Sequence, residues 1–408
     1  MSSLSVDRAP SSGAGELWSP TPVIEWLILD GWRIESTPDL IEALARRLAG
    51  GGVPLWRLFC LVPTLHPVYV GKGYRWNRDD PEIFQGFGEH GVQGLPEFLD
   101  NPMKLVIDDG FAGVRRRIPG NYTVGEFPLL DELREQGATD YVCMPLEFTS
   151  GERTAISFAT DHPDGFSAGD LKQFNDLLPV VARLIERETL RSTTENLLDT
   201  YVGNHAGRRI LRGQIKRGMV DSIDAAIWYG DLRGFTPMSE SMPRDAVLAT
   251  LNSYFETMAV PIHKQGGQVL KFIGDAMLAI FPLEEAANVE EACARALDAA
   301  NEAVAGMETL NADRAAAGQP PLEFGLALHV GEVTYGNIGA VNRLDFTVIG
   351  PAVNLAHRIE QLCKVMGRRP LLSGDFARAC GLPTESVGEH ALRGLSRPHE
   401  VYAPLSAG

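Results

Sequence analysis

The stretch KFIGDAMLAIF, residues 271–281, places a cation and an anion beside a glycine turn between two apolar strands. Lys271 belongs to the first predicted strand, and Asp275 lies in the turn. Earlier in the chain, Asp231 ends the apolar strand AAIWYGD and is followed at once by LRGFT. A carboxylate at a strand end, followed by a glycine-containing turn and a helix start, is typical of sites that hold Mg²⁺ and phosphate.

If these strands are neighbours in one sheet, Asp231 and Asp275 converge on one end of it. Two carboxylates at one place require a cation that neutralises them, because their mutual repulsion is costly. A two-metal site that handles a nucleoside triphosphate would supply that cation. Each aspartate alone is more often a simple turn residue, but the two together in their glycine contexts favour a metal site.

A third element with possible chemistry is FTVIGPAVNLAHRIE, in which Asn354 and Arg358 are four residues apart on a predicted helix. Residues at this spacing share one helix face. An arginine can stabilise the charge that develops on a phosphoryl group. Taken alone, the pair would also fit an exposed polar face.

The elements that must position these residues follow one another as strand, helix, strand, strand, helix, strand. Apolar periodicity predicts an amphipathic helix over 244–267, a hairpin over 268–282 and a long alanine-rich helix over 288–318. Residues 200–218 are basic, punctuated by glycine and short of apolar bulk, so they are predicted to be a connector.

The N-terminal half carries weaker signals. Thr37 is the predicted cap of a helix in STPDLIEALARRLAGGG, and the pattern from about 73 to 135 indicates no clear element. The later helix FSAGDLKQFNDLLPVVARLIERETL shows a coiled-coil-like seam. The seam consists of Leu171, Phe174, Leu178, Val181 and Ile185. It could pack on its own domain or form a parallel stalk between two chains, and we favour the stalk because a second domain follows.

Composition narrows the class of protein. The chain has 408 residues, enough for two or three domains, and a net charge of -16, which argues against a general nucleic-acid surface. Its apolar runs are shorter than the ~20 residues of a membrane span. Residues 1–20 resemble a mobile, disordered tail and not a secretory signal. The five cysteines are scattered, which is typical of core thiols in a reducing cytoplasm, so we expect a cytoplasmic protein.

From about 221 to 404 the chain resembles the class III nucleotidyl cyclases, through GDLRGFT, KFIGDAMLAIF, GLALHVGEVTYGNIG, FTVIGPAVNLAHRIE and LRGLSRPHEVY in the family's order. The resemblance implies an α+β fold in which the C-terminal catalytic domain has a ferredoxin-like βαββαβ core. It also implies conversion of a nucleoside triphosphate to its 3′,5′-cyclic monophosphate and pyrophosphate. The family works as head-to-tail dimers with the active site at the interface.

The resemblance assigns roles to individual positions. Asp231 and Asp275 match the family's two metal-binding aspartates, and the carbonyl of Leu232 matches its backbone metal ligand; together they imply two Mg²⁺ or Mn²⁺ ions per site. Phe235 and Thr236 lie in the turn that holds the phosphates. These residues therefore form the metal and phosphate half of the implied site.

The other half carries the reaction. Asn354 matches the residue that orients the ribose, and Arg358 matches the residue that meets charge on the reacting phosphate. Arg393 falls where the family often has a phosphate-binding lysine. Because the chain contains every required position, the resemblance implies a homodimer with two competent sites. In such a dimer Asp275 of one chain would hold metal, while Lys271 of the other chain would read the base.

The base is predicted from hydrogen-bond donors. Lys271 offers only donors, which suits the N1 acceptor of adenine and not the N1–H of guanine. Its companion position is Thr347, whose hydroxyl can accept from adenine N6 but can also donate. A Lys/Thr pair resembles the bicarbonate-responsive soluble adenylate cyclases. We therefore expect ATP as substrate and bicarbonate as a possible regulator.

The chain is thus expected to contain a tail at 1–20, an α/β GAF-like sensor domain at 21–170, a helical stalk and connector at 171–220 and a cyclase domain at 221–405. The N-terminal domain could sense an unknown small molecule, or it could be a dimerisation module without a ligand. For the whole chain, the alternatives to an adenylate cyclase are a guanylate cyclase and a catalytically silent scaffold that binds nucleotide.

Overall fold

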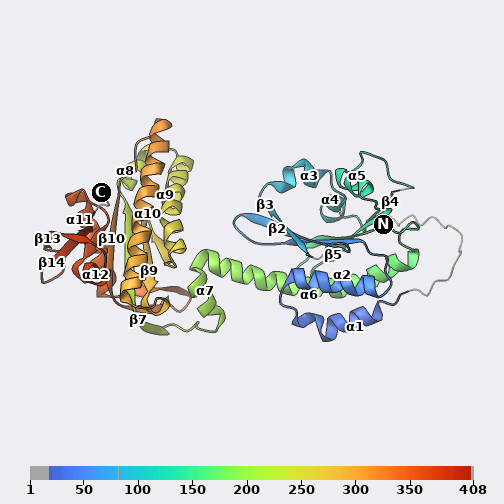
Figure 1. Ribbon diagram of the computed structural model, residues 1–408, viewed down its shortest axis with the longest axis horizontal. Helices are drawn as coiled ribbons and strands as arrows, with labels where there is room; N and C mark the ends of the chain where they lie inside the picture. Colours follow the sequence, from blue (N-terminus) through green and yellow to red (C-terminus); the bar gives the residue numbers. More distant parts are fainter. Residues whose placement is uncertain (1–17, 81, 119, 406–408) are drawn as a thin grey trace. The chain divides into compact units, whose positions relative to one another are not determined.

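The computed structural model describes residues 18–80, 82–118 and 120–405. The chain divides into two compact units with the boundary between Leu197 and Leu198, and each unit mixes helices and strands (Figure 1).

The N-terminal unit is built on a six-stranded sheet with the strand order β3-β2-β1-β6-β5-β4. Its strands are β1 (Arg57–Pro63), β2 (Tyr69–Asn77), β3 (Phe84–Glu89), β4 (Val114–Arg117), β5 (Asp140–Glu147) and β6 (Arg153–Thr160). Its helices are α1 (Thr21–Leu29), η1 (Gly31–Arg33), α2 (Thr37–Gly50), η2 (Val92–Gly94), α3 (Pro96–Leu99), α4 (Pro102–Ile107), α5 (Pro128–Glu135) and α6 (Ala168–Val202).

Alternate residues of β1 pack into two separate hydrophobic cores. Leu58 and Cys60 face a core shared with α1, α2 and α6, whereas Phe59 and Leu61 pack against a second core shared with α4 and α5. Successive side chains of a strand point to opposite faces, so the sheet is covered on both sides (Figure 1). Short elements with many glycines and prolines make up this second layer, which explains the weak pattern between 73 and 135.

Three expectations for this unit need correction. Trp18, inside the predicted tail, is buried, and its indole N–H donates to Asp170 Oδ1 at 2.7 Å; residues 1–17 of that tail lie outside the described residues. The cap of α2 is Ser36, whose hydroxyl accepts from the Asp39 N–H, because Thr37 already has helical geometry. Either side chain could have accepted this bond, so the sequence pattern left the cap ambiguous by one position.

The predicted seam of α6 is also corrected. Phe174, Val181 and Ile185 are fully buried in the core of their own unit. This half of the helix therefore covers its own sheet and is not free to form a stalk between two chains. Apolar residues at this spacing can pack against the face of a sheet as well as against a second helix, so the spacing alone does not distinguish the two arrangements.

The C-terminal unit has an eight-stranded sheet with the order β13-β14-β12-β10-β7-β9-β8, and β11 pairs with β10. Its strands are β7 (Val220–Leu232), β8 (Gln268–Ile273), β9 (Ala276–Pro282), β10 (Phe324–Ala340), β11 (Arg343–Ile349), β12 (Leu371–Ser373), β13 (Thr384–His390) and β14 (His399–Pro404). Its helices are α7 (Asn204–Leu211), α8 (Phe235–Ser241), α9 (Arg244–Lys264), η3 (Leu283–Glu285), α10 (Val289–Ala316), α11 (Pro351–Met366) and α12 (Gly374–Ala379).

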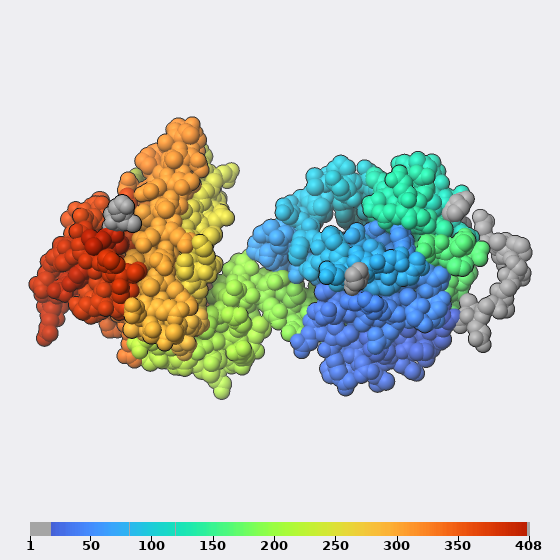
Figure 2. All heavy atoms as spheres, in the orientation of Figure 1, coloured from blue at the N-terminus to red at the C-terminus, as the bar shows by residue number. Residues whose placement is uncertain are grey.

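The central strand β7 is apolar along most of its length because both of its faces are buried. Trp228 belongs to the core beneath α9 and α10, whose surfaces lie side by side in Figure 2. Ile227 and Tyr229 point to the opposite core. The predicted connector contains α7, and its Ala206 and Ile210 join this second core. Across the part of the chain that the structure describes, every helix is too short or too polar to cross a membrane.

Candidate active site

Asp231 and Asp275 lie together at one end of the central sheet. Strand β7 pairs with β9, with Asp231 opposite Ala276, the residue that follows Asp275. The Leu232 N–H donates to the Asp275 carbonyl at 3.2 Å. Gly274 makes the turn possible with φ of 65°, in the left-handed region that favours glycine. The expectation that the two strands are neighbours is thus confirmed.

The local electrostatics show that the two carboxylates affect each other. Burial, followed by the charge of Asp275, raises the pKa of Asp231, while the Arg233 guanidinium opposes that increase. Arg233 Nη1 lies 3.3 Å from Asp231 Oδ2. A raised carboxyl pKa means that the ionised form is held at a cost, and a bound cation would remove that cost.

Arg233 also joins Asp231 to the helix α11. Its Nη2 donates to a carboxylate oxygen of Glu360 and, at 3.0 Å, to the Glu360 carbonyl. The Glu360 side chain is only 1% exposed, and burial raises its pKa to about 7 although Arg233 lowers it. Gly325 lies opposite Asp231 on β10, and a Cβ there would overlap the Glu360 carboxylate. A larger residue at position 325 would therefore displace the ion pair between Arg233 and Glu360.

The donor set fits a hard divalent cation. Mg²⁺ and Mn²⁺ prefer oxygen ligands, and Mg²⁺ is usually held by one or two carboxylates together with water and substrate phosphates. Asp231 and Asp275 offer two carboxylates of this kind at one end of the sheet. Clusters of three or more His, Cys, Asp or Glu able to hold a metal are absent from the described residues, so the protein alone does not complete the coordination.

Lys271 and Thr347 belong to a second group of polar side chains, on β8 and β11. Lys271 Nζ lies 3.9 Å from Asp345 Oδ2, and Asp345 and Thr347 are two apart on β11 and so point to one face. Thr347 is only 3% exposed, and its hydroxyl is buried with no hydrogen-bond partner among the described residues. A buried hydroxyl without a partner is costly, which favours a ligand that pairs with it.

The remaining predicted residues are more exposed. Asn354 and Arg358 share a face of α11, and Arg358 Nη1 donates to Gln361 Oε1 at 3.2 Å. Phe235 and Thr236 begin α8, directly after Gly234. Arg393 is exposed in the segment between β13 and β14.

The structure therefore brings together only part of the predicted site. In the described residues, no hydrogen bond or ion pair connects either aspartate with Lys271 or Arg358. Sequence reasoning missed Arg233, Glu360 and Asp345. Arg233 and Glu360 stand inside the quoted motifs GDLRGFT and AHRIE, but they are 127 positions apart and nothing local indicates that they pair. Asp345 could have been noticed as an acid on the same strand face as Thr347.

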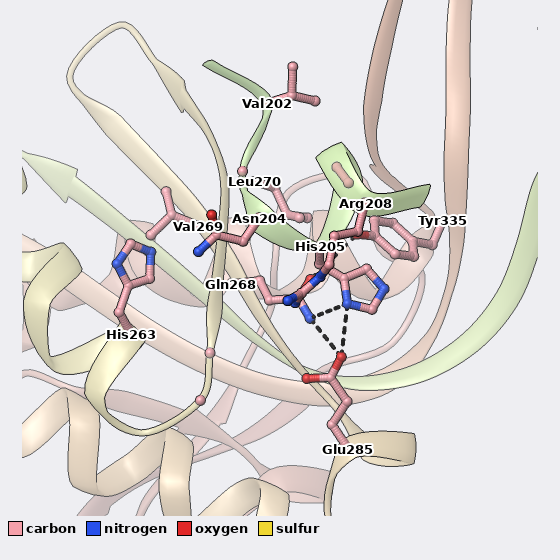
Figure 3. Close-up of a pocket in the computed structure, with 14 residues that line it drawn as sticks. Val202, Asn204, His205, Arg208, His263, Gln268, Val269, Leu270, Glu285 and Tyr335 are labelled. Atoms are coloured by element: carbon pink, nitrogen blue, oxygen red, sulfur yellow. Dashed lines mark hydrogen bonds and ion pairs between the residues drawn. The ribbon is translucent and has the colours of Figure 1, made fainter. Parts of the chain in front are cut away.

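A cavity of about 310 Å³ lies elsewhere in this unit, between α7 and the start of β8 (Figure 3). Its polar centre is a cluster in which His205 Nδ1 lies 2.9 Å from Glu285 Oε1 and Gln268 Nε2 donates to the same oxygen at 3.0 Å. Tyr335 also lines the cavity. Neither aspartate borders it, so we do not place the chemistry there.

Comparison with known proteins shows what the segment that contains these residues is similar to. Residues 219–367 match the family model described as Adenylate and Guanylate cyclase catalytic domain. An adenylate cyclase of Anabaena cylindrica is 35% identical over 173 residues, which cover 41% of this chain and 33% of the relative. An uncharacterized protein of Mycobacterium tuberculosis is 31% identical over 250 residues, covering 59% of this chain and 41% of the relative. The chain thus spans less than half the length of these curated relatives.

Among solved structures, the crystal structure of the adenylyl cyclase CyaB from P. aeruginosa is 28% identical, with a TM-score of 0.42. The match covers 46% of this chain and 97% of that chain. The description of the matching family includes both adenylate and guanylate cyclases, so the comparisons leave the nucleotide base open.

Proposed function

We propose that this protein is an adenylate cyclase, because residues 219–367 match the family model described as Adenylate and Guanylate cyclase catalytic domain. It would convert ATP to 3′,5′-cyclic AMP and pyrophosphate at the interface of a homodimer. The observation that carries the proposal is the meeting of Asp231 and Asp275 at the ends of β7 and the β8–β9 hairpin, through the Leu232 N–H and the Asp275 carbonyl.

Asp231, Asp275 and the carbonyl of Leu232 would hold two Mg²⁺ or Mn²⁺ ions. When bound, such ions neutralise phosphate charge and stabilise an attacking ribose oxygen. Arg233 provides a positive charge beside Asp231 before any ion binds. Its charge therefore offsets part of the repulsion between the two carboxylates in the free protein.

The face of α11 would supply the groups that act on the nucleotide. Asn354 would orient the ribose through its amide, and Arg358 would donate hydrogen bonds to the reacting phosphate as charge accumulates on it. Phe235 and Thr236 would contribute the turn around the phosphates, and Arg393 would add a cation. The exposure of Asn354 and Arg393 agrees with a surface that a second chain completes.

Base recognition would fall to Lys271 and Thr347. The Lys271 ammonium would donate to adenine N1, and the buried Thr347 hydroxyl, which has no partner in the described residues, would accept from the N6 amino group. Asp345 would hold the ammonium in place through its carboxylate, 3.9 Å away. The Asp345 carboxylate is also an acceptor that could meet guanine N1–H, which is the specific observation in favour of a guanylate cyclase.

The proposed dimer accounts for the presence of two oppositely charged functional residues on one short hairpin. Lys271 and Asp275 are four residues apart, and we propose that they serve the two different sites of a head-to-tail pair. Residues 21–170 would form a GAF-like sensor together with the buried half of α6, the rest of 171–220 would be the connector, and residues 221–405 would be the catalytic domain with a βαββαβ core. Sensor state and bicarbonate would then regulate turnover.

One assay tests the proposal. Purified full-length protein is given ATP or GTP with Mg²⁺ or Mn²⁺, with and without bicarbonate, and the cyclic nucleotide and pyrophosphate are quantified. We expect cyclic AMP, and its loss in Asp231→Asn. The matched control is Asp298→Asn on the exposed side of α10, which should retain activity. Cyclic GMP as the main product would establish the guanylate alternative, and no product with either nucleotide would favour the silent scaffold.

A further inference from the structure

The N-terminal unit contains a cavity of about 120 Å³ between its sheet and the helices α4 and α5. Phe59, Met103, Leu129 and Leu133 form apolar walls. The sheet contributes polar groups from three strands: Arg57 on β1, Tyr141 on β5 and Ser157 on β6. Apolar walls with a few convergent polar groups are typical of small-molecule sites.

These polar groups face the cavity because of strand register. Arg57 lies opposite Ala159, and Ala159 lies opposite Tyr141, so all three share one sheet face. Phe59 lies opposite Ser157 on the same face. The register therefore places one cation and two hydroxyls within a mostly apolar layer.

Tyr141 is the first sign that a ligand belongs there. The residue is 2% exposed, and its hydroxyl is buried and makes no hydrogen bond of normal geometry among the described residues, although Ser157 and Cys143 lie close enough for weak polar interaction with it. Burial raises the pKa of this phenol well above its usual range, so it is a neutral donor. A buried donor without an acceptor costs free energy, which a ligand acceptor would recover.

Arg57 is the second sign. Two partly buried arginines on β4, at the far edge of the same sheet, have acidic partners: Arg115 pairs with Asp140, and Arg116 pairs with Glu126. No ion pair or hydrogen bond to Arg57 is found within the described residues. Burial and the charge of Arg75 lower the pKa of Arg57, and the carboxylate of Glu132 acts in the opposite direction without an ion pair to the guanidinium among the described residues. A guanidinium with no carboxylate at ion-pair distance favours an anion from outside the chain.

We propose that this cavity binds a small monocarboxylic acid with an apolar body. The carboxylate would accept from the Arg57 guanidinium and the Tyr141 hydroxyl, and the hydrocarbon part would fill the space between Phe59, Met103 and Leu133. A cavity of ~150 Å³ holds benzene, so a cavity of about 120 Å³ that also takes the carboxylate suits a body smaller than a benzene ring, such as a short alkyl chain. Free phosphate fits poorly, because apolar walls would replace most of its hydration. The inference does not depend on the proposed cyclase activity.

Calorimetric titration of the full chain provides the test. The probes are butyrate and benzoate, which share the carboxylate but differ in body, and butyramide, which has the shape of butyrate without its charge. We expect saturable one-site binding of butyrate and an increase in the thermal unfolding temperature. Butyramide should bind at least about tenfold more weakly, since a charge-assisted hydrogen bond is lost.

Variants assign the binding to the cavity. Arg57→Gln should weaken acid binding at least about tenfold, and Tyr141→Phe should weaken it by a smaller factor while it preserves the ring. Leu133→Trp, which fills the cavity, should abolish binding. The control is Arg134→Gln on the exposed side of α5, which removes the same charge but should bind as the unmodified chain does. If Arg57→Gln does not fold, Tyr141→Phe and Leu133→Trp still decide the outcome.

Three results would overturn the proposal. The first is no heat and no thermal shift with either acid at about 10 mM, a concentration that would reveal even millimolar affinity. The second is equal binding of butyramide and butyrate, which would indicate a site for neutral molecules. The third is unchanged acid binding by Tyr141→Phe and Leu133→Trp, which would place the acid elsewhere on the chain.

Discussion

At the scale of single residues, the candidate active site depends on a side chain to which the family resemblance gives no role. Arg233 contacts both Asp231 and the buried Glu360, so the metal end of the sheet is held to α11 by one guanidinium. Buried ion pairs are not automatically stabilising, because both charges lose their hydration. Removal of one partner is nevertheless costly, since the other charge stays buried alone.

We predict that Arg233→Gln lowers the free energy of unfolding by about 3 kcal/mol, because Glu360 then has no partner. The double variant Arg233→Gln/Glu360→Gln should recover more than half of that loss, since two neutral amides replace the pair. Chemical denaturation measures both values. Arg368→Gln, which removes an exposed pair with Glu385, is the control and should cost less than about 1 kcal/mol. Equal stability of the single and double variants would contradict the prediction.

A second residue, His329, predicts a pH dependence of stability. It is buried on β10 with Nδ1 2.7 Å from Ser373 Oγ, and burial lowers its pKa to about 4, although Asp375 acts in the opposite direction. The unfolded chain protonates this histidine near pH 6.5 and the folded chain does not. Its contribution to stability is therefore complete above pH 6.5 and is lost as the pH falls toward 4.

The expected loss across this range is up to about 3 kcal/mol from His329 alone. His329→Gln retains a hydrogen-bonding group for Ser373 but cannot titrate. We therefore predict that the variant loses less stability than the unmodified chain between pH 7 and pH 5. Chemical denaturation at several pH values measures the difference. Parallel curves for the two proteins would show that His329 titrates normally in the fold.

At the scale of elements, the sequence predicts the hairpin and its neighbour well. Asp231 ends an apolar run that is buried on both faces, and Asp275 sits in a glycine turn, so their meeting follows once β7 and β9 pair. These signals are local, and the sheet only has to bring two strand ends together. The roles assigned to the two residues by family resemblance stay predictions.

Other features could not be read from local patterns. The pairing of Arg233 with Glu360 joins residues that are far apart in the chain. The α6 seam has a period that fits either a partner helix or a sheet face, and only the fold shows that Phe174 packs in its own unit. The sequence around Arg57 does not indicate a binding site, because the absence of an ion-pair partner can be seen only in the folded sheet.

The β8–β9 hairpin carries the third prediction, which concerns the base. Lys271→Glu should lower efficiency with ATP at least about tenfold, because a carboxylate cannot donate to adenine N1. The structure adds a complication, since Asp345 lies 3.9 Å from Lys271 and would repel the new carboxylate. The informative variant is therefore Lys271→Glu/Asp345→Asn, tested with and without Thr347→Cys. Both versions should favour GTP relative to the unmodified protein.

Competition between ATP and GTP in one reaction measures this preference directly. Lys216→Glu reverses a charge on an exposed lysine and should leave the ratio unchanged. The Mn²⁺ dependence of each variant must also be normal, because Asp275 is four residues away on the same hairpin. An unchanged ratio with normal metal dependence would mean that Lys271 does not read the base.

At the scale of the whole molecule, the two halves of the proposed site are separate within one chain. Asp231 and Asp275 lie at a sheet end, whereas Asn354 and Arg358 lie on a helix face, and no hydrogen bond or ion pair joins the two groups in the described residues. A single chain would then be inactive however well it folds. A head-to-tail pair of chains would bring the metal half of each to the helix face of the other.

Mixing of two inactive variants tests this arrangement. Asp231→Ala and Arg358→Ala homodimers should both lack activity, because every site contains one defect. After subunit exchange of equal amounts, half of the dimers combine the two variants, and each of these has one intact site. The mixture should therefore recover about a quarter of normal activity. The control is an equal mixture of the double variant Asp231→Ala/Arg358→Ala with unmodified protein, whose mixed dimers have a defect in both sites. This mixture should keep only about the quarter of activity that the unmodified homodimers supply, whereas it would keep about half if both residues acted within one chain. Exchange is verified by co-purification through two different affinity tags. If exchange is complete and activity does not return, Asp231 and Arg358 act within the same chain, and the proposed shared interface is wrong.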